Sequence, residues 1–301
     1  MLLLIGNILV LSRRMDDQQA QQSVWQARQA YSQETTILPA EPVGGTDERV
    51  EKENTETVSI VEEEVPQAQQ PEILETLEEP EIAEIPPTPE QEPLEEHALY
   101  LEHLDLHELR KTNPDVLGWI SIPGTQLDYP ILQGEDNQYY LKRTWQGKSN
   151  SAGSIFLECK VDPTFEDFNT IIYGHNMKNG SMFGSLRQYR TQSHYEANPW
   201  IYIVDDEGIC RYEIFAAFEA EVTGYTYRLD INTPEKKQAL LAYSLEKSVI
   251  DAKIVPSAED PIITLSTCTG NGYDTRWVVQ AVLTGRFPVQ ASAPEVPEAE
   301  H

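Results

Sequence analysis

Cysteine and positively charged residues are scarce in this chain. Three cysteines among 301 residues are too few for a disulfide scaffold, and they lack the spacing of a zinc site. Lysine and arginine number 22 against 50 aspartate and glutamate residues, so the formal net charge is −28. A surface this negative repels phosphate backbones, which argues against nucleic acid as a partner.

A long hydrophobic run is also missing. The first 11 residues are apolar, whereas a membrane-spanning helix needs about 20 such residues. A secretory signal has its positive charges before the apolar run, but Arg13 and Arg14 follow it here. Three interpretations of residues 1–33 stay open: a truncated membrane anchor followed by a polar stem, a short segment that touches a bilayer, or an apolar stub packed on another surface.

Residues 34–93 form a second region of biased composition. Between Glu34 and Glu96 there are 20 acidic residues, nine prolines, two basic residues, and no aromatic residue or cysteine. Such a segment cannot bury enough apolar surface to offset the entropy lost on folding, so we predict a disordered, extended linker. The tail, residues 289–301, is again rich in proline and glutamate and is predicted to be loose. The remaining residues, 94–288, have the length of one globular domain.

The pattern of residues 94–288 predicts mainly β structure with peripheral helices. An N-terminal helix is expected over Leu94–Lys111, where apolar residues recur at helical spacing. Asn113-Pro114 ends this helix. Eight short strand-like runs follow, bounded by turn signals, and their close spacing favours a closed barrel. The predicted strands are Gly118–Ile122, Tyr129–Leu132, Ser154–Leu157, Thr170–Tyr173, Trp200–Val204, Arg211–Phe218, Ile262–Thr267 and Trp277–Leu283. Further helices are predicted at Asn137–Arg143, Met182–Tyr189 and Thr233–Val249.

Three residues have the chemistry of a cysteine-based active site. Cys268 ends the apolar strand Ile262–Thr267, and an Asn-Gly turn leads to a return strand that begins at Arg276. Such a turn places the guanidinium beside the thiol, where it can lower the thiol pKa or donate hydrogen bonds to an oxyanion. His175 follows the strand Thr170–Tyr173 in a glycine-flanked loop, and polar residues at the mouth of a barrel are typical of functional sites.

Each of these residues also has a simpler interpretation. A single cysteine at a strand end is more often a small buried apolar residue, and a loop histidine or an arginine after a turn is usually solvated. Cys159 and Cys210 are assigned to the class of structural cysteines. His103 and His107 have the spacing of helical metal ligands, but no third ligand accompanies them, so no metal site is predicted.

Longer motifs around these residues resemble the sortase family. Thr264–Cys268, with Arg276 eight residues later, is similar to the sortase active-site signature. Tyr173–Met177, followed by Met182-Phe183, is similar to the histidine motif of the family. Further segments have the look of class B sortases: Asn113–Ile120, Leu127–Pro130, Asp136–Leu141 and Gly153–Phe156.

The likeness covers about residues 95–285 in the order of the family. It includes the N-terminal helix and a helix-containing insertion between Glu221 and Pro261. The order of the candidate residues also argues against a papain-like peptidase, in which the cysteine comes first, because His175 precedes Cys268 here.

The resemblance implies an eight-stranded sortase-type β-barrel and a cysteine transpeptidase. Cys268 is then the nucleophile that cleaves a C-terminal sorting motif of a secreted protein after its threonine, His175 exchanges protons, and Arg276 stabilises the oxyanion. The acyl group passes to an amine of a peptidoglycan precursor or of a pilin. The implied location is the outer face of the membrane of a Gram-positive bacterium, with the N-terminus as anchor, and the chemistry requires no cofactor.

The resemblance also implies a substrate groove lined by Asn137, Thr223, Tyr227 and Ser266. The simpler interpretation of Thr223 and Tyr227 is an ordinary surface loop. Two other functions stay open: a cysteine peptidase that only hydrolyses its substrate, and a non-catalytic module of the wall that binds peptides. The presence of all three catalytic candidates weighs against the binding module.

Overall fold

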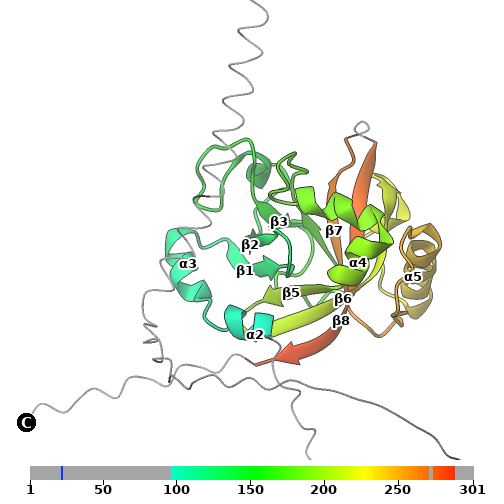
Figure 1. Cartoon of the computed structure of the whole chain (residues 1–301). Coiled ribbons are helices and arrows are strands. Elements are labelled where there is room, and N and C mark those ends of the chain that lie inside the picture. The colour runs from blue at the N-terminus through cyan, green and yellow to red at the C-terminus, as the bar shows by residue number, and fades with distance from the viewer. Residues whose placement is uncertain (1–21, 23–95, 271–273, 289–301) are drawn as a thin grey trace, which may run out of the picture. The chain divides into compact units, whose positions relative to one another are not determined.

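The computed structural model describes residue 22, residues 96–270 and residues 274–288 (Figure 1). Apart from residue 22, the predicted N-terminal segment 1–33 lies outside the described residues, as do the predicted linker 34–93 and tail 289–301. Among the described residues, no helix is long and apolar enough to cross a membrane.

Eight strands close into a barrel, which confirms the predicted mainly-β fold with peripheral helices. The order around the barrel is β1-β2-β3-β4-β7-β8-β6-β5, and β5 pairs again with β1. Two contacts, β2 with β3 and β4 with β7, are parallel, and the other pairs are antiparallel. The strands are β1 (Val116–Ser121), β2 (Asp128–Leu132), β3 (Ile155–Leu157), β4 (Asn169–Tyr173), β5 (Trp200–Val204), β6 (Ile209–Glu221), β7 (Ile262–Cys268) and β8 (Thr275–Phe287).

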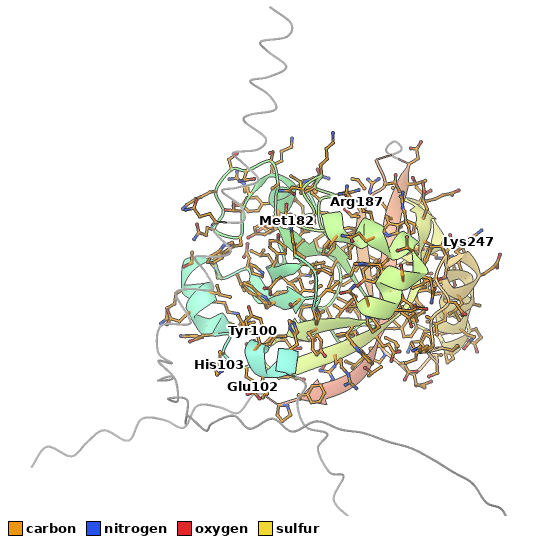
Figure 2. The ribbon with its side chains drawn as sticks, in the orientation of Figure 1. Tyr100, Glu102, His103, Met182, Arg187 and Lys247 are labelled. Atoms are coloured by element: carbon orange, nitrogen blue, oxygen red, sulfur yellow. The ribbon has the colours of Figure 1, made fainter. Side chains whose placement is uncertain are left out.

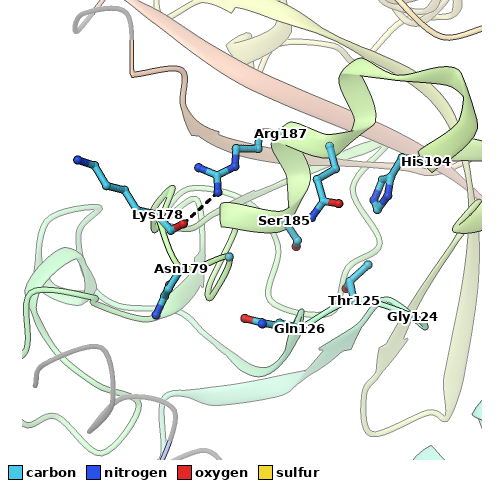
Figure 3. A pocket seen from close by; sticks show the side chains of 10 residues that line it. Gly124, Thr125, Gln126, Lys178, Asn179, Ser185, Arg187 and His194 are labelled. Carbon is cyan, nitrogen blue, oxygen red and sulfur yellow. Dashed lines mark hydrogen bonds between the residues drawn. The ribbon is translucent and has the colours of Figure 1, made fainter. Parts of the chain in front are cut away.

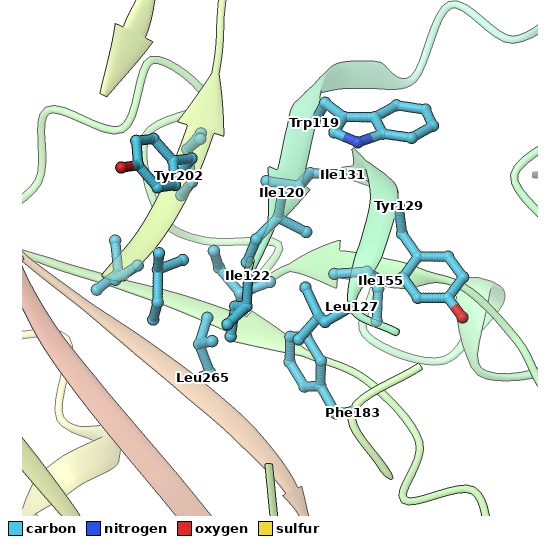
Figure 4. Packing of buried hydrophobic residues seen from close by; sticks show 14 of the residues in the cluster. Trp119, Ile120, Ile122, Leu127, Tyr129, Ile131, Ile155, Phe183, Tyr202 and Leu265 are labelled. Carbon is cyan, nitrogen blue, oxygen red and sulfur yellow. The ribbon is translucent and has the colours of Figure 1, made fainter. Parts of the chain in front are cut away.

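The strands form because short apolar runs bury side chains inside the barrel. Ile120, Ile131 and Leu265 come from three different strands and pack in one fully buried cluster (Figure 4). Complete burial of such a side chain stabilises the fold by about 1.5–3 kcal/mol relative to exposure. Strand β7 is buried on both faces, because Ile262 packs outside the barrel in a second cluster with Leu240 of helix α5 (Pro234–Lys247). Strand β7 therefore ends at Cys268, and this last residue is the exposed one in an otherwise buried strand.

The predicted N-terminal helix is interrupted. Instead of one helix over Leu94–Lys111, the chain forms α2 (Glu96–Leu101) and α3 (Leu106–Thr112). The Asp105 side chain causes the break, because it accepts a hydrogen bond from the backbone N–H of Glu108 at 3.0 Å and so caps a new helix. Both short helices still bury leucines against the barrel core.

The other helices differ from the prediction in type more than in place. Two predicted helices are 3-10 segments, η1 (Tyr139–Lys142) and η2 (Gly184–Arg190), while α5 is a true helix capped by Thr233 as expected. Helix α4 (Gln192–Ala197) and the 3-10 turn η3 (Tyr225–Tyr227) were not predicted.

Candidate active site

Cys268 and Arg276 are direct partners across the β7–β8 ladder. They form the last residue pair of an antiparallel register that begins at Ile262 opposite Val282. Cys268 is exposed, and the partly buried Arg276 donates from Nη1 to its neighbour's carbonyl, Thr275 O, at 2.8 Å. The structure thus brings a solvent-accessible thiol and a guanidinium to the same end of two adjoining strands.

His175 reaches the same rim through the parallel β4–β7 pair. The last pair in that register is Tyr173 with Ser266, two residues before His175 and Cys268 respectively. Two further hydrogen bonds continue the contact: Gly174 N donates to Ser266 O at 3.2 Å, and Thr267 Oγ1 donates to Gly174 O at 2.7 Å. These contacts bring the loop that carries His175 to the end of β7 that carries Cys268.

The imidazole of His175 is oriented by a backbone carbonyl. Its Nε2 lies 2.8 Å from Leu141 O. A carbonyl oxygen only accepts hydrogen bonds, so Nε2 carries the proton in the neutral ring, and Nδ1 is the nitrogen that can take up another. The ring is partly buried. This arrangement provides one group that can exchange a proton at the rim.

Asn176 is a site residue that the sequence reasoning missed. Its Nδ2 donates to the main-chain carbonyl of Cys268 at 2.7 Å. The His175 carbonyl accepts a hydrogen bond from Phe183 N at 3.0 Å, and a β-bridge joins Asn176 to Met182. The loop that carries His175 is therefore closed on itself and fastened to the end of β7. The only signal in the sequence was the position of this amide directly after the candidate histidine.

Ser266 and Tyr227 meet beside this rim. The Tyr227 hydroxyl lies 2.8 Å from Ser266 Oγ, which connects η3 to β7. Burial raises the pKa of Tyr227 to about 12, with Cys268 acting in the same direction, whereas the Ser266 hydrogen bond and Arg276 oppose the increase. The phenol is therefore protonated at neutral pH and can serve as a hydrogen-bond donor in a groove.

Asn137 belongs to a neighbouring polar cluster. Its Nδ2 donates to Glu158 Oε2 at 2.6 Å, and its Oδ1 accepts from Cys159 N at 2.8 Å. The Tyr173 hydroxyl donates to the same Glu158 oxygen at 3.0 Å, and Tyr173 is the register partner of Ser266. Asn137 is thus joined to the rim through Glu158 and Tyr173, two residues that the sequence reasoning did not select.

Thr223 occupies an exposed turn after β6. The preceding residue, Val222, donates its backbone N–H to Asp274 O at 2.9 Å, which holds the turn beside the start of β8. Thr223 therefore lies near the start of β8, and no hydrogen bond or ion pair among the described residues holds its side chain in a groove.

The other two cysteines have environments that suppress reactivity. Burial raises the pKa of the Cys210 thiol to about 12, and nearby Asp205 adds to the increase. Burial and the adjacent Glu158 also raise the pKa of Cys159. Within residues 96–270 and 274–288, no group of three or more histidine, cysteine or acidic side chains is placed to hold a metal ion. The rim around Cys268 has the groups that acyl transfer through a thiol requires: a ring that can exchange a proton and a cation that can bind an oxyanion.

Comparisons with known proteins agree with this chemistry. Residues 120–284 match the model of the sortase domain family. Sortase B of Listeria monocytogenes is 39% identical over 183 residues, which are 60% of this chain and 74% of the relative. The Staphylococcus aureus sortase B–substrate complex is 32% identical with a TM-score of 0.57, covering 60% of this chain and 84% of that one. A crystal structure of sortase B complexed with triglycine has the same identity and a TM-score of 0.56, covering 59% and 84%.

The chain belongs to the sortase family, whose model matches more than half of its length. Both the curated relatives and the solved structures are sortases B. The protein is therefore a class B sortase, a cysteine transpeptidase built on an eight-stranded barrel.

Proposed function

We propose that Cys268, His175 and Arg276 carry out the transpeptidation on a C-terminal sorting motif of a secreted protein. The Cys268 thiolate attacks the carbonyl carbon of the motif's threonine, and the Arg276 N–H groups stabilise the resulting oxyanion. The proton of the Cys268 thiol has passed to Nδ1 of His175, and when the C–N bond breaks the imidazolium gives this proton to the leaving amine. The observation that supports this assignment most strongly is the direct pairing of Cys268 with Arg276 at the exposed end of β7 and β8.

The thioester formed in the first half is resolved by an amine. The incoming nitrogen attacks the acyl carbon and gives up a proton to His175, while the Cys268 sulfur leaves as thiolate. A peptidoglycan precursor or a pilin is the proposed acceptor. A related sortase B has been solved in complex with triglycine, which supports an acceptor with a primary amine at the end of a small peptide.

The substrate peptide is proposed to lie along Tyr227 and Ser266. These residues adjoin the rim, and a protonated phenol can donate to a peptide carbonyl. Asn137 extends the groove through its contact with Glu158, and Thr223 closes the end near β8. A complex of a related sortase B with its substrate supports a peptide groove on this fold.

The proposed location is the outer face of the membrane of a Gram-positive bacterium, anchored through the N-terminal segment. The family supports this location, and the apolar run at residues 1–11 is the part of the segment proposed to contact the membrane. The secreted substrates and the wall amine that the mechanism needs both occur on that side.

The decisive experiment mixes the full chain with fluorogenic pentapeptides that contain Asn-Pro or Leu-Pro as candidate sorting motifs. Triglycine or a diaminopimelate peptide is added as the acceptor amine. Mass spectrometry follows the products. We expect an amide-joined product that disappears in Cys268→Ala. Arg276→Lys should lower the acylation rate by about 10²-fold or more, the scale of a lost oxyanion donor.

Arg286→Lys is the matched control, since Arg286 lies at the other end of the same strand. Its acylation rate should equal that of the unchanged chain. Hydrolysis that no amine alters would replace the proposal with a peptidase. Failure of every peptide to form an acyl-enzyme would leave only a peptide-binding module.

A further inference from the structure

A polar pocket of about 470 Å³ lies outside the catalytic rim (Figure 3). The β1–β2 turn, the loop that follows His175, and the segments η2 and α4 enclose it. None of the seven residues assigned above to catalysis or to the groove lines it. Its lining residues are Gly124, Thr125, Gln126, Lys178, Asn179, Gly180, Ser185, Arg187, Gln188 and His194.

The pocket is positively charged in a strongly acidic protein. Two of its ten lining residues, Lys178 and Arg187, are cations and none is acidic, although the chain has 50 acidic residues against 22 basic ones. The ion pairs between described residues involve other cations. Arg187 donates one hydrogen bond, from Nη2 to Lys178 O at 3.0 Å, out of the five that a guanidinium can make. Both cations can therefore bind an anion.

A buried hydroxyl faces the same space. Ser185 is only 2% exposed, and its Oγ has no hydrogen-bond partner among the described residues. Figure 3 shows the side chain pointing from η2 toward the side of the pocket that Gln126 lines. Buried polar groups are nearly always paired in folded proteins, so an unpaired hydroxyl here indicates a place for a hydrogen-bonding ligand.

His194 provides a second unpaired donor. The amide nitrogen of Asn198 lies 3.4 Å from His194 Nδ1, so Nδ1 accepts and the proton of the neutral ring is on Nε2. Nε2 is buried and, within the described part of the chain, has no partner. Burial also lowers the pKa of His194, which favours this neutral form. The pocket wall thus presents an N–H group as well as an O–H group.

We propose that this pocket binds a polar oxyanion, a carboxylate or phosphate group on a small hydrogen-bonding molecule such as a peptide or a sugar. Lys178 and Arg187 supply the charge, and Ser185 and His194 supply directed donors. Charge-assisted hydrogen bonds of this kind are the strong ones in proteins. None of the ten described lining residues has an aliphatic side chain, so they offer a hydrocarbon ligand nothing to pack against.

The test is an NMR titration of the isotopically labelled full chain with inorganic phosphate and, separately, with acetate. Sodium chloride at the same ionic strength is the blank. We expect saturable shifts of the Arg187 and His194 side-chain signals with one or both oxyanions and none with chloride. Saturation by phosphate alone identifies a phosphorylated ligand, and saturation by acetate alone identifies a carboxylate.

Substitutions distinguish a built site from general attraction. Arg187→Gln should weaken binding about tenfold or more, as expected for a lost charged hydrogen bond, and Ser185→Ala should weaken it by a smaller factor. Lys247→Gln removes the same charge at the far end of α5, well away from Arg187 (Figure 2), and should leave the affinity unchanged.

Absence of saturation with both oxyanions would overturn the proposal, and so would equal weakening by Arg187→Gln and Lys247→Gln. Thermal melts of each variant establish that it is folded. The readout is binding rather than turnover, so the result is independent of the roles given to Cys268, His175 and Arg276.

Discussion

The side-chain amide of Asn176 donates to the main-chain carbonyl of Cys268 at 2.7 Å, although the two residues are 92 positions apart in the chain. The hydrogen bond connects the residue after the candidate base to the backbone of the candidate nucleophile. It therefore ties together the backbone segments that carry the two candidate side chains, without using either side chain. This makes Asn176 a positioning residue, and its removal should affect the chemical step more than the fold.

Asn176→Ala is expected to slow acyl-enzyme formation by about two- to tenfold, because one hydrogen bond of this kind contributes about 0.5–1.5 kcal/mol. Rapid-quench measurement of the acylation rate checks this, alongside the melting temperature. Asn232→Ala, which truncates an exposed asparagine next to α5, is the control and should leave the rate unchanged. An unaltered acylation rate in folded Asn176→Ala would show that this hydrogen bond has no catalytic role.

Gly174→Ala should damage both stability and activity. A Cβ at Gly174 would lie 2.5 Å from Ile155 Cδ1 and 2.7 Å from Phe183 Cγ, and both of those side chains are buried. Overpacking of this type costs about 1–3 kcal/mol. Since Phe183 N also holds the His175 carbonyl, displacement of Phe183 moves the loop that carries the imidazole.

Thermal unfolding and kcat/KM measure the two effects of that substitution. Adding Phe183→Leu, which makes room for the new methyl group, should recover part of the stability lost in Gly174→Ala. If Gly174→Ala melts at the same temperature as the unchanged chain, the close packing around Gly174 does not exclude a larger side chain.

The three cysteines should react with iodoacetamide at very different rates. Cys268 is exposed, whereas the pKa values of Cys210 and Cys159 are both raised, that of Cys210 to about 12. Because the thiolate is the reactive form, modification at pH 8 is expected at Cys268 first. Peptide mapping by mass spectrometry over time gives the three rates. Labelling of Cys159 or Cys210 as fast as Cys268 would contradict the environments described here.

Asp128 should make stability depend on pH. It accepts a hydrogen bond from Trp119 Nε1 at 2.6 Å, and burial raises its pKa to about 7. Between about pH 4 and pH 7 the unfolded chain has released this proton while the folded chain still holds it. The contribution of Asp128 to the free energy of unfolding therefore falls as the pH rises through this window and is constant above it.

Asp128→Asn keeps the accepting oxygen and removes the titration. Urea unfolding at pH 4 and at pH 8 should show the variant gaining stability relative to the unchanged chain at the higher pH. If the free energies of unfolding of the variant and the unchanged chain differ by the same amount at pH 4 and at pH 8, the raised pKa of Asp128 is ruled out.

Local patterns were sufficient for the strands and for one contact in the site. The eight apolar runs between turn signals are the eight strands, with bounds that differ by a few residues. The Asn-Gly turn predicted that Arg276 lies beside Cys268, and the two are register partners. Both predictions depend on residues close together in the sequence, where turn chemistry and alternation decide the outcome.

Contacts between distant segments could not be derived in this way. The parallel pairing of β4 with β7 brings His175 toward Cys268, and no local pattern encodes which strands become neighbours. In the sequence, only the family resemblance connected these two residues. Glu158 was not predicted for a similar reason, because its partners Asn137 and Tyr173 come from other segments of the chain.

The interrupted N-terminal helix shows a different limit. Leucines recur at helical spacing on both sides of Asp105, so periodicity alone continues through the break. The capping preference of aspartate was the available signal, and it outweighed the continuous stripe once each half could bury its own leucine.

Strand β8 is the last strand of the described chain, yet it is hydrogen-bonded on both sides, to β7 and to β6. A chain still under synthesis, or one cut before Thr275, possesses the thiol and the imidazole but lacks the guanidinium and leaves the edges of β6 and β7 unpaired. The pairing of β8 with β6 joins segments that are far apart in the sequence, and proteins dominated by such non-local pairings fold slowly. With the role proposed for Arg276, turnover begins only when β8 has been inserted, and enzymatic activity then reports that the barrel is complete.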